Sequence, residues 1–389
     1  MVRDLTADRR GAADGRPLLF RGRPDTLFTV LVFILLLLGT VVLMSASSTY
    51  TGDEGDSPFG EVRSHLLHMA IGFLAMIPCI LFVTPALVRR LTPAFGAVSF
   101  IGLLVVLAAG TADGIAKRWI FIGPISIQPS EFAKTAVILL SALVISSGRG
   151  ETGDQEEERG MKRWLRTFFI PMAITGAACL LILLEHHLSG FVITAAIGIF
   201  MTFAGGAAVF WELAVIGAGA GLVWLAVQSG YTSDRVTSWL HRGADLKGID
   251  WQTTQGIYAI GSGGLFGKGI GESLLKYGYV SEVANDFIFT VVCEELGFFG
   301  ATGILLIFAA AVFRGFVLGF KCRDRFASLV ILGLSFKFGI HVLLNVMVVT
   351  GLIPNTGISL PFFSSGGSAT LMQMFDAGLL LGLSRYCDP

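Results

Sequence analysis

Residues 26–44 have the sequence TLFTVLVFILLLLGTVVLM, a run without a single charged residue. At 1.5 Å per residue, a helix of about twenty apolar residues crosses the roughly 30 Å hydrocarbon core of a bilayer. A secretory signal peptide has a shorter apolar region, of about 7–15 residues. Although Ser45-Ala46-Ser47 resembles a cleavage site, we expect this run to be an uncleaved membrane anchor rather than a signal peptide.

Further apolar runs of similar length follow, and they predict an all-α polytopic membrane protein with ten transmembrane helices. The expected spans are 26–44, 66–83, 94–110, 131–147, 167–184, 188–206, 207–228, 287–313, 327–351 and 369–384. Very short turns separate the fifth, sixth and seventh runs, so fusing two of them would leave nine spans. The composition agrees, because 53% of the 389 residues are hydrophobic and 14% are charged, against about 25% charged in a soluble domain.

The distribution of basic residues sets the expected orientation. With the N-terminus inside, 18 of the 28 Lys and Arg residues fall in inner segments and 8 in outer segments. Because basic residues accumulate in cytoplasmic loops, we expect both termini in the cytoplasm. The formal net charge is zero, so no overall field favours nucleic acid as a partner.

These spans define a cytoplasmic tail, 1–25, and one membrane domain, 26–385. The domain carries a charged cytoplasmic linker, 148–166, and a long outer loop, 229–286, between the seventh and eighth spans. Long loops are usually functional or disordered, and this outer loop is too aromatic for pure disorder. Five cysteines are present without a CxxC pair, so we expect neither a disulfide framework nor a zinc site.

A charge inside a membrane span is a functional candidate by default. Glu131 and Lys134 lie three residues apart at the start of the fourth span, where they share a helix face and can pair. Ser130 suits the N-cap of this helix, with Pro129 before it. The pair is either a cap and salt bridge near the interface, or the lining of a polar cavity that receives a head group.

Other costly polar residues lie deeper. Lys337, His341 and Asn345 share one face of the ninth span, where glue between helices and substrate contact are equally open interpretations. Glu294 and Glu295 fall in the eighth span, and at least one should face the bundle interior. We expect His186-His187, at a tight outer turn, to be solvated.

Asp286 lies at the outer mouth of the eighth span. An Asp before an apolar run is a good helix N-cap. Alternatively, its carboxylate at the boundary of water and lipid is where a general base would meet a substrate with a lipid tail and a polar head. Nearby, the glycine-rich stretch 261–271 fails the GxxxxGK[ST] phosphate-loop pattern. Its amides could still form an anion-binding nest, or the stretch could simply be a flexible loop.

Several stretches in combination resemble the SEDS family of bacterial membrane proteins (shape, elongation, division and sporulation), which includes FtsW, RodA and SpoVE. The resemblance covers about residues 26–385. The matching stretches are Lys117-Arg118-Trp119, Gln128-Pro129-Ser130-Glu131 with Lys134, Gly267-Lys268-Gly269-Ile270-Gly271 with Ser273 and Lys276, Ser281-Glu282 through Asp286-Phe287-Ile288-Phe289, Glu294-Glu295-Leu296-Gly297, Asn345, Thr350-Gly351-Leu352-Ile353-Pro354-Asn355-Thr356-Gly357, Leu360-Pro361-Phe362 and Ser364-Ser365-Gly366-Gly367-Ser368. One segment departs: many members have Gln-Pro-Asp-Leu-Gly where this chain has Glu185-His186-His187-Leu188-Ser189-Gly190, so no role of that acid is carried over to His187.

The resemblance implies a multi-pass peptidoglycan glycosyltransferase of the bacterial cytoplasmic membrane, used in elongation, division or sporulation. Its substrate would be lipid II, a disaccharide-pentapeptide on undecaprenyl pyrophosphate, polymerised at the outer face. The implied partner is a cognate class B penicillin-binding protein, which crosslinks the new strand. The family's essential Asp maps onto Asp286, and its Glu and Lys in the fourth span map onto Glu131 and Lys134.

The chemistry is consistent with a single base. A sugar hydroxyl is a poor nucleophile at neutral pH and gains from a carboxylate within hydrogen-bond reach. The pyrophosphate leaving group needs charge neutralisation more than a general acid. No cofactor is obligatory from the sequence and the metal requirement is left open: a bound divalent cation or outer cations could neutralise the charge. The candidate outer cations are Lys117, Arg118, Arg235, Lys268 and Lys276.

Two other functions remain open at this stage. A flippase that moves lipid II across the membrane would also need charged residues inside its spans, but here the informative residues gather toward one membrane face. A scaffold that only recruits the transpeptidase would leave Asp286 and the outer motifs without a purpose.

The basic-residue count makes a testable prediction about topology. Single cysteines placed at 155 and at a position within 240–280 should differ in intact cells: the outer one should react with an impermeant thiol reagent and the inner one should not. Permeabilised cells, in which both should react, provide the control. Labelling at 155 in intact cells would overturn the orientation.

Overall fold

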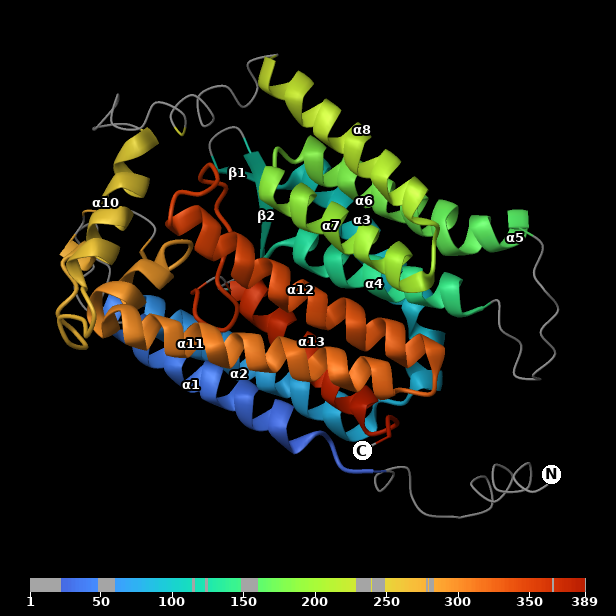
Figure 1. Cartoon of the computed structure of the whole chain (residues 1–389), viewed down its shortest axis with the longest axis horizontal. Coiled ribbons are helices and arrows are strands. Elements are labelled where there is room, and N and C mark those ends of the chain that lie inside the picture. The colour runs from blue at the N-terminus through green and yellow to red at the C-terminus, as the bar shows by residue number, and fades with distance from the viewer. Residues whose placement is uncertain are drawn as a thin grey trace.

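Long helices make up almost all of the described chain, packed side by side as a bundle (Figure 1). The computed structural model describes residues 22–47, 60–113, 116–122, 125–147, 160–228, 239, 249–277, 279, 283–365 and 367–388. Its helices are α1 (Thr26–Ser47), α2 (Gly60–Phe82), α3 (Pro85–Ala109), α4 (Pro129–Ser146), α5 (Gly160–Trp164), η2 (Leu165–Phe169), α6 (Ile170–Leu184), α7 (Leu188–Gly205), α8 (Val209–Gln228), α10 (Ile249–Ser262), η3 (Leu275–Tyr277), α11 (Ile288–Lys321), α12 (Arg325–Val349) and α13 (Gly367–Ser384).

A helix lies at each of the ten expected runs. Within the described chain, eight helical stretches are long and apolar enough to cross a membrane. These are Thr26–Ser47, Val62–Phe82, Pro85–Ala108, Pro129–Ser146, Gly160–Leu184, Leu188–Gly205, Ile288–Lys321 and Arg325–Val349. The remaining two expected runs, 207–228 and 369–384, coincide with α8 and α13.

A small antiparallel sheet interrupts the helical pattern between α3 and α4, which the all-α expectation did not include. Its strands β1 (Thr111–Asp113), β2 (Ala116–Ile122) and β3 (Ile125–Ile127) pair in the order β1-β2-β3. The apolar and β-branched residues of 119–122 suit a strand, and Ile120 pairs with Ile127. The sheet matters because β2 carries Arg118 and leads, through β3, into α4.

The start of α4 differs from the expectation. The helix begins at Pro129, and the N-cap position belongs to Gln128, which makes no side-chain capping hydrogen bond. Proline is well suited to the first helical position, because its missing N–H would have no partner there. Ser130 is therefore inside the helix, where its hydroxyl lies 3.2 Å from Nδ1 of His187.

Helix α11 is broken at Gly297, whose backbone has φ 68° and ψ −170°. The glycine-rich segment 263–271 docks at this break. The amide of Lys268 donates to the carbonyl of Glu294, and the amide of Gly269 to the carbonyl of Glu295, both at 3.0 Å. In the other direction, the amide of Phe298 donates to the carbonyl of Gly264 at 2.9 Å. The sequence left an anion-binding nest and a flexible loop open for this stretch, and these two amides cannot serve a nest because helix carbonyls accept from them. The segment instead supports α11 around its break at Gly297, downstream of Asp286.

The C-terminus is attached to the loop between α11 and α12. Cys322 and Cys387 form a disulfide, and Arg323 pairs with Asp388 at 2.8 Å. The expectation of no disulfide is corrected here. A search for neighbouring cysteines could not find this pair, because its members are 65 residues apart.

Inside the bundle, one polar face of helix α12 contacts both α4 and α13. Nζ of Lys337 donates to Oδ2 of Asp376 on α13 at 2.6 Å and to Oγ1 of Thr135 on α4 at 2.9 Å. Lys337 and Asp376 are both buried. Asp376 is thus the partner that the sequence did not name for Lys337, and the pair fixes α12 against α4 and α13.

This pair predicts a stability effect. Asp376→Ala should leave Lys337 as an uncompensated buried charge and destabilise the protein by about 3–5 kcal/mol. Lys337→Leu combined with Asp376→Leu should recover most of that loss, because no buried charge remains. Thermal unfolding of the purified protein in one fixed detergent would measure both effects.

The exposed pair of Arg323 and Asp388 provides the matched control. Their side chains are 84% and 52% exposed, and exposed ion pairs contribute at most about 1 kcal/mol. Asp388→Ala should therefore unfold close to the wild-type temperature. An Asp376→Ala protein that unfolds like the Asp388→Ala control would contradict a stabilising role for the buried pair.

Candidate functional site

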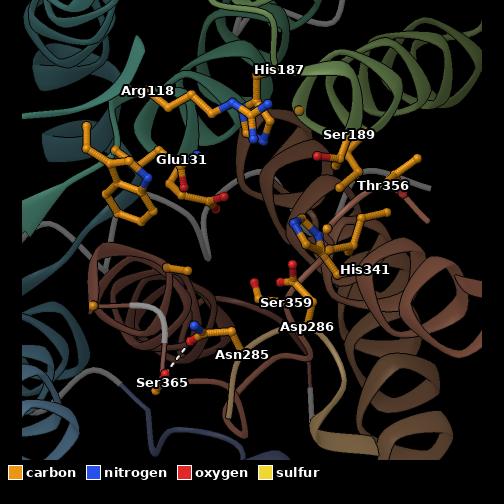
Figure 2. A pocket seen from close by; sticks show the side chains of 18 of the residues that line it. Arg118, Glu131, His187, Ser189, Asn285, Asp286, His341, Thr356, Ser359 and Ser365 are labelled. Atoms are coloured by element: carbon orange, nitrogen blue, oxygen red, sulfur yellow. Dashed lines mark hydrogen bonds between the residues drawn. The ribbon is translucent and has the colours of Figure 1, made fainter. Parts of the chain in front are cut away.

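A polar cavity of about 620 Å³ brings together residues from distant parts of the chain. Arg118 comes from β2, Glu131 and Lys134 from the first turns of α4, and His341 from α12. Asp286 reaches it from the segment just before α11. Figure 2 shows Arg118, Glu131 and His187 along one wall and Asn285, Asp286 and Ser365 along the facing wall.

The charged wall contains the ion pair expected from spacing. Nζ of Lys134 donates to Oε1 of Glu131 at 2.6 Å, and both side chains are buried. The same Nζ lies 3.1 Å from Nε2 of His341. Because Nδ1 of His341 lies 2.7 Å from the carbonyl of Lys337, which can only accept, Nδ1 carries the proton and Nε2 accepts from Lys134. Glu131 and Lys134 thus form the expected salt bridge and also line the cavity, while binding of a head group there stays a prediction.

The turn between α6 and α7 supplies the edge of this wall. His186 is exposed, as expected, but His187 is buried and lines the cavity. Burial lowers the pKa of His187 to about 3, helped by the nearby cations Lys134 and Arg118. His187 is therefore neutral near neutral pH, and the expectation that it is solvated is wrong.

Arg118 is tied to the same turn. Its Nη2 donates to the carbonyl of His186 at 2.8 Å. The neighbouring Glu185 is buried, and burial raises its pKa to about 8, against an opposing effect of Arg118. The turn that departs from the family motif thus places a neutral imidazole at the cavity and a protonated carboxyl behind it.

The facing wall is formed by Asp286 and the segment 355–365. Asp286 is half-buried and is not the helix cap, since the N-cap position of α11 belongs to Phe287. Nδ2 of Asn345 donates to the carbonyl of Asp286 at 2.9 Å, and Oγ of Ser364 donates to the carbonyl of Asn285 at 2.7 Å. The cap interpretation of Asp286 is therefore wrong, whereas its carboxylate lines a polar cavity.

The remaining predicted site residues lie elsewhere. Lys268 pairs with Glu294 at 2.7 Å, and Nζ of Lys276 donates to the carbonyl of Gly271 and lies over the ring of Tyr277. Neither lines the cavity described above. Lys117 lies on β2 and its side chain is not described, while Arg235 lies outside the described residues.

The sequence interpretation missed several lining residues. These uncharged residues, which had no predicted site role, are Ser126 on β3, Gln252 on α10, and Asn285, Thr356 and Ser359 outside regular elements. Their amide and hydroxyl groups suit hydroxyl-rich ligands. In the described chain, no group of three or more His, Cys, Asp or Glu side chains is arranged to hold a metal ion.

The charged wall leads to a prediction. Glu131→Ala should leave Lys134 buried without its carboxylate and lower abundance or activity, and Lys134→Ala should do the same to Glu131, at a cost of about 3–5 kcal/mol each. Exchanging the two residues should recover part of the abundance, since the opposite charges remain adjacent.

Quantitative membrane immunoblots would measure abundance, and assays of glycan synthesis from lipid II would measure activity. Ser141→Ala, a change at another buried polar residue of α4 that does not line the cavity, is the control and should behave like the wild type. Normal abundance and normal activity in both single alanine variants would contradict the pairing argument.

Comparison with known proteins agrees with this geometry. The cell cycle protein family FTSW_RODA_SPOVE matches residues 25–388. The stage V sporulation protein E of Bacillus subtilis (strain 168) is 35% identical over 367 residues, 93% of this chain and 97% of that protein. A probable peptidoglycan glycosyltransferase FtsW of Trichlorobacter lovleyi is 33% identical over 369 residues, 92% and 93% of the two chains.

The fold is shared as well. A chain in the structure of a peptidoglycan synthase complex that coordinates polymerization and crosslinking superimposes with a TM-score of 0.74 at 25% identity, over 93% of this chain and 98% of that one. The sequence match and the shared fold each cover 93% of this chain. Both confirm the resemblance found in the motifs, and the chain belongs to the FtsW, RodA and SpoVE family of cell cycle proteins.

Proposed function

We propose that the protein is a peptidoglycan glycosyltransferase that polymerises lipid II into glycan strands. The observation that carries the proposal is the shared cavity, in which a half-buried carboxylate, Asp286, faces the cations Arg118 and Lys134 across a polar space. A base opposite cations is what attack by a sugar hydroxyl on a diphosphate-linked sugar requires. The FtsW relative from Trichlorobacter lovleyi, a probable peptidoglycan glycosyltransferase, supports the same reaction.

In the proposed reaction the acceptor hydroxyl loses its proton to Asp286 as its oxygen bonds to the anomeric carbon of the donor sugar. The bond from that carbon to the diphosphate oxygen breaks, and the lipid diphosphate leaves with the electron pair. Arg118 and Lys134 offset the charge on the leaving group, an electrostatic role that is strongest in a water-poor cavity. Gln252, Asn285 and Ser359 lie where neutral donors and acceptors can orient the sugars.

We also propose the topology that this reaction needs. The chain would span the bacterial cytoplasmic membrane ten times, with both termini in the cytoplasm and the cavity open to the outer side. Two features support it: the excess of basic residues in the inner segments, and the position of the cavity among residues that precede α4, α7 and α11 on the expected outer side.

The proposed partner is a class B penicillin-binding protein, which would crosslink the strands made here. It is supported by the structural relative, a chain of a peptidoglycan synthase complex that couples polymerization to crosslinking. A divalent cation beside the diphosphate remains a prediction, to be tested by adding and chelating Mg²⁺ in the synthesis assay.

Asp286→Asn tests the proposed base. Asparagine preserves the size of the side chain but cannot take up a proton at neutral pH, so polymerisation should fall on the order of 10²–10⁴-fold. Insertion and thermal unfolding should stay near wild type. Glycan chains formed from labelled lipid II by matched amounts of purified protein give the measurement.

Two controls complete this test. Asp388→Asn removes an exposed acid near the C-terminus and should polymerise like the wild type, while excess Mg²⁺ should fail to rescue Asp286→Asn unless the carboxylate acts through a metal. If Asp286→Asn makes glycan at the wild-type rate, the assignment of Asp286 as the base is wrong.

A further inference from the structure

The backbone of Asp286 is held by a residue that does not line the cavity. Asn345 on α12 is fully buried, and its Nδ2 donates twice: to the carbonyl of Asp286 at 2.9 Å and to the carbonyl of Ile358 at 2.6 Å. Both partners can only accept, so the orientation of the amide is fixed by chemistry. One side chain thereby ties the segment before α11 to the segment after α12.

The second segment approaches Asp286 from the other side. Gly357, next to Ile358, has φ +68°, and a Cβ built on it would lie 2.9 Å from Oδ2 of Asp286. The carboxylate thus rests over a position that has no room for a side chain. A shift of segment 357–358 would move the surface on which the carboxylate lies, and Asn345 links this segment to the backbone of Asp286.

The buried amide of Asn345 carries a cost in folding free energy. Its Oδ1 is buried without a hydrogen-bond partner in the described chain, and a buried unsatisfied oxygen is unfavourable. Each such group in a folded protein asks for an explanation. A donor that serves two buried carbonyls offers one, because neither an apolar residue nor a carboxylate could serve them both.

Helix α12 also sets the position of Asn345 and its two hydrogen bonds relative to the charged wall. His341, one turn before Asn345, contacts Lys134. Four residues of α-helix rise about 6 Å, so the same rigid element holds the proposed base and the proposed phosphate-binding cation at a set spacing along its axis.

We propose that Asn345 is a positioning residue for Asp286: it acts on the reaction only by holding the segment of Asp286 against segment 357–358. The proposal rests on the proposed function above. It predicts that loss of the amide leaves lipid II binding intact and slows the chemical step, because misplacing a reacting group by about 1 Å can cost on the order of 10²-fold in rate.

The activity test uses Asn345→Asp and Asn345→Leu, which keep the size of the side chain but remove the donor. Each should lower kcat about 10²-fold with KM for lipid II unchanged. In an Asp286→Asn background, the same changes should lower the residual rate no further, because there is no base left to position. Additive losses in the double variants, or a rise in KM at constant kcat, would overturn the proposal.

A second readout does not depend on catalysis. Asp286→Cys should react with a soluble thiol reagent at a measurable rate, and adding Asn345→Leu should raise that rate several-fold as the segment loosens. An unchanged rate would overturn the positioning role even if Asp286 is the base. A raised labelling rate together with an active Asp286→Asn protein would support the positioning role of Asn345 but contradict the role of Asp286 as the base.

Ser335→Ala is the matched control for both measurements. Ser335 is a buried polar residue of the same helix, and its hydroxyl donates only locally, to the carbonyl of Ile331 at 2.7 Å. Removing it should leave kcat, KM and the labelling rate near wild type. If Asn345→Leu does not accumulate, Asn345→Asp, compared with the wild type at matched unfolding temperature, decides the test.

Discussion

A charged side chain inside a membrane protein must find an opposite charge, and in this molecule that requirement organises the bundle around α12. Lys337 pairs with Asp376 on α13, and Lys134 on α4 pairs with Glu131 while also donating to the neutral His341 on α12. Removing water makes these interactions strong and makes their absence expensive. The residues that the bilayer would otherwise exclude are therefore the ones that fix α4, α12 and α13 relative to each other, and with them the charged wall of the cavity.

The facing wall is built differently, from backbone rather than charge. The segment before α11 contains no regular structure, and its carbonyls are satisfied by side chains of Asn345 and Ser364. Downstream, the glycine-rich segment replaces the helical hydrogen bonds that α11 loses at Gly297. Asp286 lies between these two supports, which allows an irregular stretch to hold a carboxylate in a defined place.

Much of this could be predicted from the sequence because the signals are local. Apolar runs mark helices directly, and the spacing of Glu131 and Lys134 predicts a pair that the structure confirms. The motif resemblance was confirmed by the family match. The role of Asp286 as a base stays a prediction, although its place in the cavity agrees with that role.

What could not be predicted depends on contacts between distant segments. An acid within the apolar run 369–384 was a visible signal, yet nothing local assigns Asp376 to Lys337. Nor does the sequence show that Lys268 is committed to Glu294, or that His187 is turned into the cavity rather than toward solvent. The sheet that carries Arg118 was missed because β1 and β3 have only three residues each and β2, AKRWIFI, does not alternate apolar and polar side chains.

The pairing of Lys337 with Asp376 also has a consequence for biogenesis. The two residues are 39 positions apart and belong to successive helices, and the ribosome delivers the lysine first. Until α13 has emerged and entered the bilayer, the ninth expected span carries a cation without its acid. Insertion of α13 is thus the step that neutralises Lys337, and a chain released before that step would carry an uncompensated cation inside its bundle.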